Sequence, residues 1–136
     1  MNVLSLDIGS IRVGVAWGST ETKLAFPLSI LDLSDFLNNS KKVKGIIEEF
    51  DPGLLVIGNP VSLNGEENSQ SLKVKDLGSK IAKVLSLPVE FVDERLTSKQ
   101  AKKILKNKGL NQKQMRGKLD DIAASLILQT WFDAKT

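Results

Sequence analysis

Carboxylates in three separate segments are the most promising candidates for catalysis or metal binding in this chain. Asp7 stands near the end of an apolar segment with alternating polarity, and Asp93 and Glu94 directly follow another apolar segment. Asp120 begins a stripe at helical spacing that continues with Ala123, Ala124, Ile127 and Trp131. The chain has no histidine and no cysteine. Clustered carboxylates would therefore favour a hard cation, Mg²⁺ or Mn²⁺, which promotes phosphoryl displacement.

The carboxylates that follow the apolar segments also have structural explanations. Asp7 could accept hydrogen bonds from the turn at Gly9, and Asp93 or Glu94 could pair with Arg95. Taken singly, these explanations are slightly favoured. Together with Asp120 they are less convincing, because ligands gather at the carboxyl ends of strands in α/β sheets.

The acidic pair Asp120 and Asp121 could simply complement the dipole at the start of a helix. That explains acidic residues in general, but not why one of them leads the apolar stripe. Adjacent helical residues are separated by about 100° of rotation, so only one should point into a site. The stripe favours Asp120, and the choice between the two stays open.

A long basic segment lies between the second and third groups of carboxylates. From Ser98 to Lys118 there is no acidic residue, while the basic residues are Lys99, Lys102, Lys103, Lys106, Lys108, Lys113, Arg116 and Lys118. Such a segment attracts phosphate backbones. The alternative is a solvated helix face followed by a basic loop.

Hydrophobic periodicity predicts the strands and helices that carry these residues. We predict strands over Val3–Ile8, Arg12–Trp17, Leu24–Leu31, Leu54–Ile57 and Val89–Val92. We predict helices from Ser34 or Asp35 to about Phe50, from about Ser69 to Leu85, from Thr97 or Ser98 to near Gly109, and from about Lys118 to Phe132. Pro27 puts the third strand at or near an edge, and a polar loop over Gly58–Glu67 follows the fourth.

This order predicts an α/β fold: a mixed five-stranded sheet, with a three-strand antiparallel meander, two parallel strands, and helices on both faces. Residues 1–136 are expected to form one domain, because the chain is too short for two substantial ones. The amino-terminal stretch lacks a basic leader, and no apolar run approaches membrane-spanning length. We therefore expect a cytoplasmic protein without a membrane partner.

The sequence resembles the YqgF family, also called RuvX, whose members are described as pre-16S rRNA nucleases and Holliday junction resolvases with a ribonuclease-H-like fold. The likeness is carried by blocks spread over essentially the whole chain: Asp7-Ile8-Gly9 with Arg12-Val13-Gly14-Val15-Ala16, Val56-Ile57-Gly58-Asn59-Pro60 with Asn64-Gly65, Val92-Asp93-Glu94-Arg95-Leu96-Thr97, and Lys118-Leu119-Asp120 with Ala123-Ala124-Ser125-Leu126-Ile127-Leu128. Asn59 departs from the family pattern, which usually has an apolar residue there.

The resemblance implies that Asp7, Glu94 and Asp120 are catalytic and hold one or two Mg²⁺ or Mn²⁺ ions. Supporting roles would fall to Asp93, Arg95 and Asp121, and the Gly58-Asn59-Pro60 loop with Asn64-Gly65 would lie at the substrate rim. Nucleic-acid contacts are expected from Arg12, Asn59, Lys99, Lys102, Lys103, Lys106, Lys113, Arg116 and Lys118.

The function that we predict is metal-dependent cleavage of phosphodiester bonds in structured nucleic acid, with the 5′ end of the pre-16S rRNA as substrate in ribosome biogenesis. A Holliday junction resolvase is the first alternative, and a non-catalytic RNA-binding ribosome-assembly factor is the second. An ATP-dependent enzyme of the sugar-kinase, Hsp70 and actin type is disfavoured, because the chain lacks a second lobe to enclose ATP. We expect a monomer or a weak homodimer.

Overall fold

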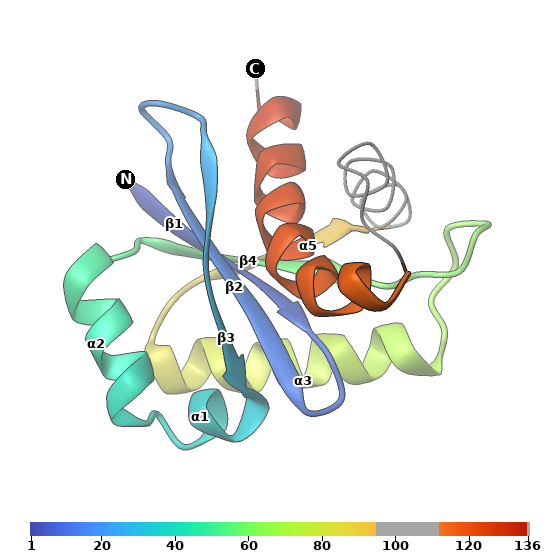
Figure 1. Cartoon of the computed structure of the whole chain (residues 1–136), viewed down its shortest axis with the longest axis horizontal. Coiled ribbons are helices and arrows are strands. Elements are labelled where there is room, and N and C mark those ends of the chain that lie inside the picture. The colour runs from blue at the N-terminus through green and yellow to red at the C-terminus, as the bar shows by residue number, and fades with distance from the viewer. Residues whose placement is uncertain (95–111, 136) are drawn as a thin grey trace.

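The computed structural model describes residues 1–94 and 112–135, with side chains of the last helix described from residue 122 onward. Its five-stranded sheet has the order β3-β2-β1-β4-β5 (Figure 1). The antiparallel meander consists of β1 (Asn2–Ile8), β2 (Arg12–Ser19) and β3 (Ala25–Asp32). The parallel strands β4 (Leu54–Asn59) and β5 (Val89–Asp93) extend the sheet from β1. The predicted mixed sheet is confirmed.

Strand positions follow from the sequence pattern. Every residue of β4 is buried, as expected for a strand between neighbours with both faces covered. β3 lies at one edge of the sheet, and it carries Pro27, which a central strand could not accommodate. β4 runs two residues further than predicted, so Gly58 and Asn59 belong to the strand and not to the loop.

The predicted single helix up to Phe50 is wrong, because the structure has two helices there. α1 (Leu33–Leu37) is followed by α2 (Lys41–Phe50). Between them Asn39 has a positive φ of 49°, a left-handed conformation that asparagine tolerates and that ends a helix. The apolar periodicity continued across the break because both helices face the same core.

The remaining described helices are α3 (Ser69–Leu85) and α5 (Gln112–Ala134). The bounds of α3 agree with the prediction, whereas α5 begins at Gln112 and not near Lys118. The Gln, Lys, Met and Arg residues that precede Gly117 have good helix propensity, and the glycine does not end the helix. The predicted basic helix up to Gly109 lies outside the described residues.

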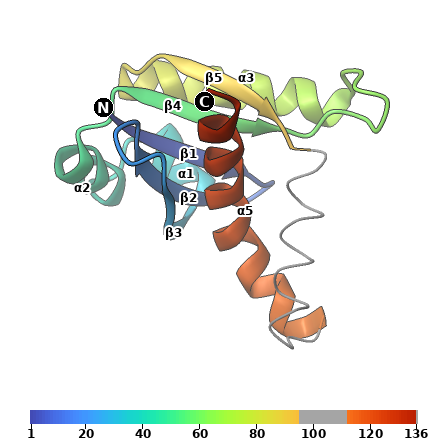
Figure 2. The same cartoon turned by 90° about the horizontal axis from the view of Figure 1, so that it is seen from above.

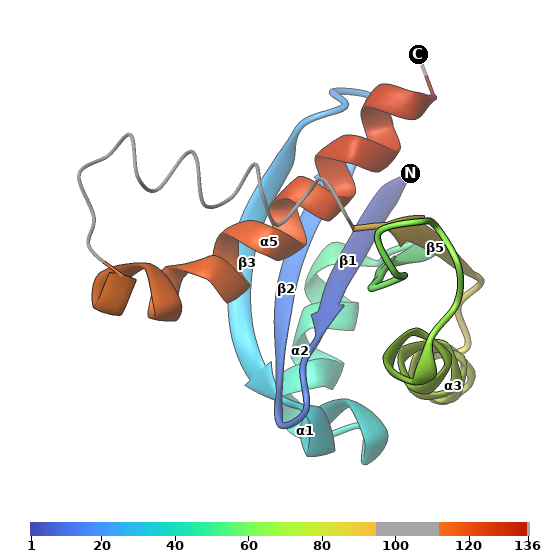
Figure 3. The same cartoon turned by 90° about the vertical axis from the view of Figure 1, so that its right-hand side faces the viewer.

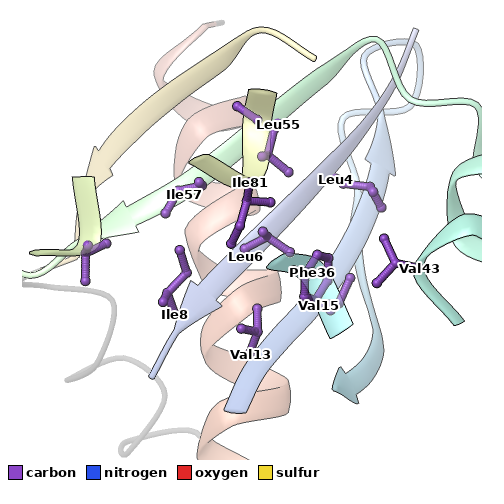
Figure 4. Close-up of a cluster of buried hydrophobic side chains, with 12 residues drawn as sticks. Leu4, Leu6, Ile8, Val13, Val15, Phe36, Val43, Leu55, Ile57 and Ile81 are labelled. Atoms are coloured by element: carbon purple, nitrogen blue, oxygen red, sulfur yellow. The ribbon is translucent and has the colours of Figure 1, made fainter. Parts of the chain in front are cut away.

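Side-chain alternation along the strands divides the core between the two faces of the sheet. Figure 4 shows the larger cluster, in which β1, β2 and β4 pack against α1, α2 and α3. α5 covers the other face (Figures 2 and 3), where Ile127, Leu128 and Phe132 pack on β1 and β4. No helix within the described ranges is long and apolar enough to cross a membrane.

Candidate active site

Asp7 lies on the face of the sheet that α5 covers. Leu4, Leu6 and Ile8 alternate into the opposite cluster, so Ser5 and Asp7 point toward α5. Asp7 is half-buried one residue before the end of β1. The strand therefore delivers this carboxylate to the carboxyl edge of the sheet, as the sequence predicted.

Glu94 reaches the same face from β5. Val92 packs in the α5 cluster, and Trp131 of α5 donates a hydrogen bond to Glu90 at 3.2 Å. Alternation then brings Glu94 to the α5 face and leaves Asp93 on the face of α3. The Glu94 backbone N–H donates to the Asn59 carbonyl at 3.2 Å, which holds it against the end of β4.

The side chains of Asp7 and Glu94 are hydrogen-bonded to each other. Burial, the Asp7 charge, the hydrogen bond to Asp7 and the Asp93 charge, in order of size, raise the pKa of Glu94 to about 7. Two carboxyl groups in contact cannot both ionise without a large repulsion. The pair therefore holds a proton near neutral pH, and a cation between the two groups would relieve the same repulsion.

Gly58 provides the space in which the Glu94 carboxyl lies. A Cβ at Gly58 would collide with Oε2 of Glu94 and would lie 2.5 Å from Cδ1 of Ile127. Because real Cβ atoms essentially never come within 3.0 Å of a neighbour, only glycine lets α5 and Glu94 approach β4 together. The family resemblance implied a place for Gly58 at the substrate rim, and this packing role was not predicted from the sequence. The signal was a glycine at the end of a buried strand, which often marks a close approach.

A buried hydrogen bond fixes α5 relative to β1. The Ser5 hydroxyl, which is 0% exposed, donates to the Ala124 carbonyl at 2.6 Å. Asp120 and Asp121 lie in α5 one turn before Ala124, and their side chains are outside the described residues. Among the side chains that are described, no group of three or more His, Cys, Asp or Glu residues could hold a metal ion.

The predicted nucleic-acid residue Asn59 is buried, with 7% of its surface exposed. Its amide donates to Glu67 at 3.2 Å, while Lys75 forms an ion pair with Glu67 at 2.6 Å. Lys75 and then the Ser71 hydroxyl lower the pKa of the Glu67 carboxyl. Asn59 thus ties the end of β4 to Glu67, and Glu67 in turn contacts Ser71 and Lys75 of α3.

The other predicted nucleic-acid residues are only partly within the described structure. Arg12 is exposed where β2 begins, at the edge of the sheet where β1 ends. Arg95, Lys99, Lys102, Lys103 and Lys106 lie outside the described residues. The backbone of Lys113, Arg116 and Lys118 lies in α5.

A family model described as "RuvX: Holliday junction resolvase" matches residues 1–134. The chain belongs to the RuvX family. A RuvX relative from Thermosynechococcus vestitus, named "Putative pre-16S rRNA nuclease", is 38% identical over 136 residues, which is 100% of this chain and 90% of the relative. A relative of the same name from Methylobacillus flagellatus is 37% identical over 131 residues, which is 96% of this chain and 90% of the relative.

Solved structures similar to this RuvX chain include Thermus thermophilus RuvC in complex with a Holliday junction substrate. That chain matches with a TM-score of 0.57 at 17% identity, over 99% of this chain and 95% of RuvC. The Fowlpox virus resolvase in complex with Holliday junction DNA matches with a TM-score of 0.56 at 19% identity, over 99% of both chains. These likenesses identify the fold as ribonuclease-H-like, as predicted from the resemblance.

Proposed function

We propose that this RuvX-family chain is a metal-dependent nuclease that processes the 5′ end of the 16S rRNA precursor. The observation that carries the proposal is the contact between the carboxyl groups of Asp7 and Glu94 at the ends of two strands. A structural role explains such a contact poorly, because burying the two carboxyl groups together raises the pKa of Glu94 and costs stability once the pair ionises. The names of the relatives support the RNA substrate.

The residues present fit a hard divalent cation. The chain offers carboxylate oxygens and neither histidine nor cysteine, which favours Mg²⁺ or Mn²⁺. Asp7 and Glu94 would hold the ion, and they would do so in the ionised form. When bound, such an ion polarises a phosphoryl oxygen and makes water a better nucleophile. The protein itself contributes the fixed placement of the two carboxylates.

Helical spacing supports Asp120 over Asp121 as a third ligand. Ile127 lies against Gly58 of β4, and position 120 precedes it by seven residues, two turns along the same helix side. Phe132 instead lies against Gly18 of β2, and position 121 precedes it by eleven residues, three turns along its side. Position 120 therefore shares the side of α5 that faces β4, next to which Glu94 lies.

Nucleic-acid binding is proposed for exposed Arg12 and for the basic residues around the start of α5. Supporting roles remain proposed for Asp93, Arg95 and Asp121. Asp93 acts at least through its charge, which contributes to the raised pKa of Glu94.

The test is cleavage of labelled precursor rRNA and of four-way junction DNA, side by side, with Mg²⁺, with Mn²⁺ and with EDTA. We expect the wild type to cut the RNA in either metal and not in EDTA, and Asp7→Asn to be inactive. Asp51→Asn is the matched control. Asp51 is exposed and follows α2, at the edge of the sheet where β4 begins and away from Glu94.

Cutting of the junction but not of the RNA would replace the rRNA substrate with the alternative that the family description names. That outcome would also predict a dimer in solution, since a junction cutter needs paired sites. Salt-sensitive RNA binding without turnover in any metal would favour a non-catalytic assembly factor. Equal activity of Asp7→Asn and the wild type would refute the site.

A further inference from the structure

A small pocket lies at the edge of the sheet where β1 ends, next to Asp7, but on the face that α3 covers. It has a volume of about 90 Å³ and lies between the β1–β2 turn and the first half of α3. We name it the α3 pocket, and its lining includes Ile8, Ser10, Gln70, Lys73, Val74 and Leu77. Ile8 directly follows Asp7. A nucleic-acid strand that crosses the end of β1 would therefore pass both the carboxylate pair and the pocket.

The α3 pocket has an apolar floor and a polar rim. Ile8 and Val74 are buried and belong to the main core cluster, and Leu77 packs against it. Ser10, Gln70 and Lys73 are exposed around the opening. Apolar surface with a few convergent polar groups is the lining that organic ligands need. A volume of about 90 Å³ suits one part of such a ligand, such as a single base, and not a whole nucleotide. A nucleotide has the matching chemistry, with an apolar base or sugar face beside an anionic phosphate.

The charge of Lys73 is available for such a phosphate. Lys75 pairs with Glu67 and Lys80 pairs with Asp76, whereas Lys73 has no ion pair with any other described residue.

We propose that the α3 pocket holds one nucleotide of the substrate strand, with its base on Val74 and Leu77 and its phosphate at Lys73. The inference rests on the proposed nuclease function, and it adds a binding subsite on the face of the sheet opposite the carboxylate pair. The subsite orients the strand across the end of β1 and contributes to binding, not to the chemical step.

The test measures binding of a labelled single-stranded RNA by fluorescence anisotropy in EDTA, over a series of salt concentrations. The slope of log K against log salt is negative, and loss of one phosphate contact makes it less steep by about 0.7. We expect Lys73→Gln to show this decrease and a several-fold weaker affinity at low salt, and in cleavage to raise KM while kcat is kept. Lys83→Gln is the matched control, because Lys83 lies in the last turn of the same helix. It should leave slope and affinity unchanged.

Abasic substitution, moved along the RNA one nucleotide at a time, tests the apolar floor. We expect one position near the cleavage site at which removal of the base weakens binding to the wild type, and less so to Leu77→Ala, which shortens the floor. If no position shows this difference, the base does not lie on the floor and the proposal is wrong. If the wild type cuts RNA but Lys73→Gln keeps the wild-type salt slope and KM, the subsite is refuted and the nuclease function stands. If the wild type neither binds nor cuts RNA, both proposals fall.

Discussion

The metal-free protein should lose stability as the pH rises from 5 to 8.5, because the carboxyl pair must then give up its proton. Glu94 has a pKa of about 7 in the folded protein against 4.5 for the free side chain. A raised folded-state pKa stabilises the fold fully below the unfolded value, and this contribution is lost as the pH rises through the folded value. At about 1.36 kcal/mol for each pH unit, the loss is at most about 3 kcal/mol.

Urea denaturation in EDTA at a series of pH values measures this loss. The chain has no histidine, so no imidazole titrates in the same window and masks the effect. Asp7→Asn removes the neighbouring charge but not the burial, which is the largest cause of the raised pKa. The pH dependence should therefore shrink without vanishing, and the variant should be more stable than the wild type at pH 8.5.

Mg²⁺ supplies the second half of this experiment. An ion that binds only the folded state stabilises it by about 2.7 kcal/mol at a hundred times its Kd, and it favours the ionised pair. The wild-type profile should become flatter in Mg²⁺, whereas that of Asp7→Asn should change little. An equally flat profile for wild type and variant in EDTA would refute the carboxyl contact, and an unchanged wild-type slope in Mg²⁺ would refute the cation site.

Further substitutions test how the site is supported. Gly58→Ala should abolish cleavage by displacing Glu94, and it should destabilise the fold by about 1–3 kcal/mol. Gly45→Ala is the control, because its Cβ would meet nothing within 4 Å. It should stabilise the fold by about 0.5–1 kcal/mol. An active, fully stable Gly58→Ala would contradict the close approach to that carboxyl. Asn59→Leu should cost less than about 1 kcal/mol in urea denaturation, because it exchanges one hydrogen bond to Glu67 for apolar burial. Asn59→Asp, of the same shape, should cost several times more by burying a charge beside Glu67, and equal costs for the two variants would argue against that contact.

The sequence predicted the sheet well because its strands are apolar, short and separated by clear turn residues. The same alternation could also have separated Asp93 from Glu94, since Glu94 shares its face with Val92. Asp7 was identified as a candidate because a carboxylate near the end of a buried strand needs a partner. What periodicity could not reveal was that its described partner is another carboxylate.

Features that depend on contacts between distant segments were not predictable from local pattern. The hydrogen bond from Ser5 to Ala124 joins residues at opposite ends of the chain, and no residue near Ser5 in the sequence predicts it. The break at Asn39 was hidden because the helices on both sides place apolar residues toward one core. The network around Asn59 was missed for the same reason, since its partner Glu67 lies eight residues further along the chain, just before α3.

Equilibrium binding of Mn²⁺, measured by electron paramagnetic resonance at pH 8, tests most directly whether the Asp7 and Glu94 carboxyls form a cation site. The wild type and Asp51→Asn should bind Mn²⁺ with the same affinity. Asp7→Asn and Glu94→Gln should each bind Mn²⁺ at least about tenfold more weakly. Each variant loses a direct metal ligand, and even the loss of an outer-shell partner lowers metal affinity by about tenfold or more. Unchanged Mn²⁺ affinity in both variants would contradict the account.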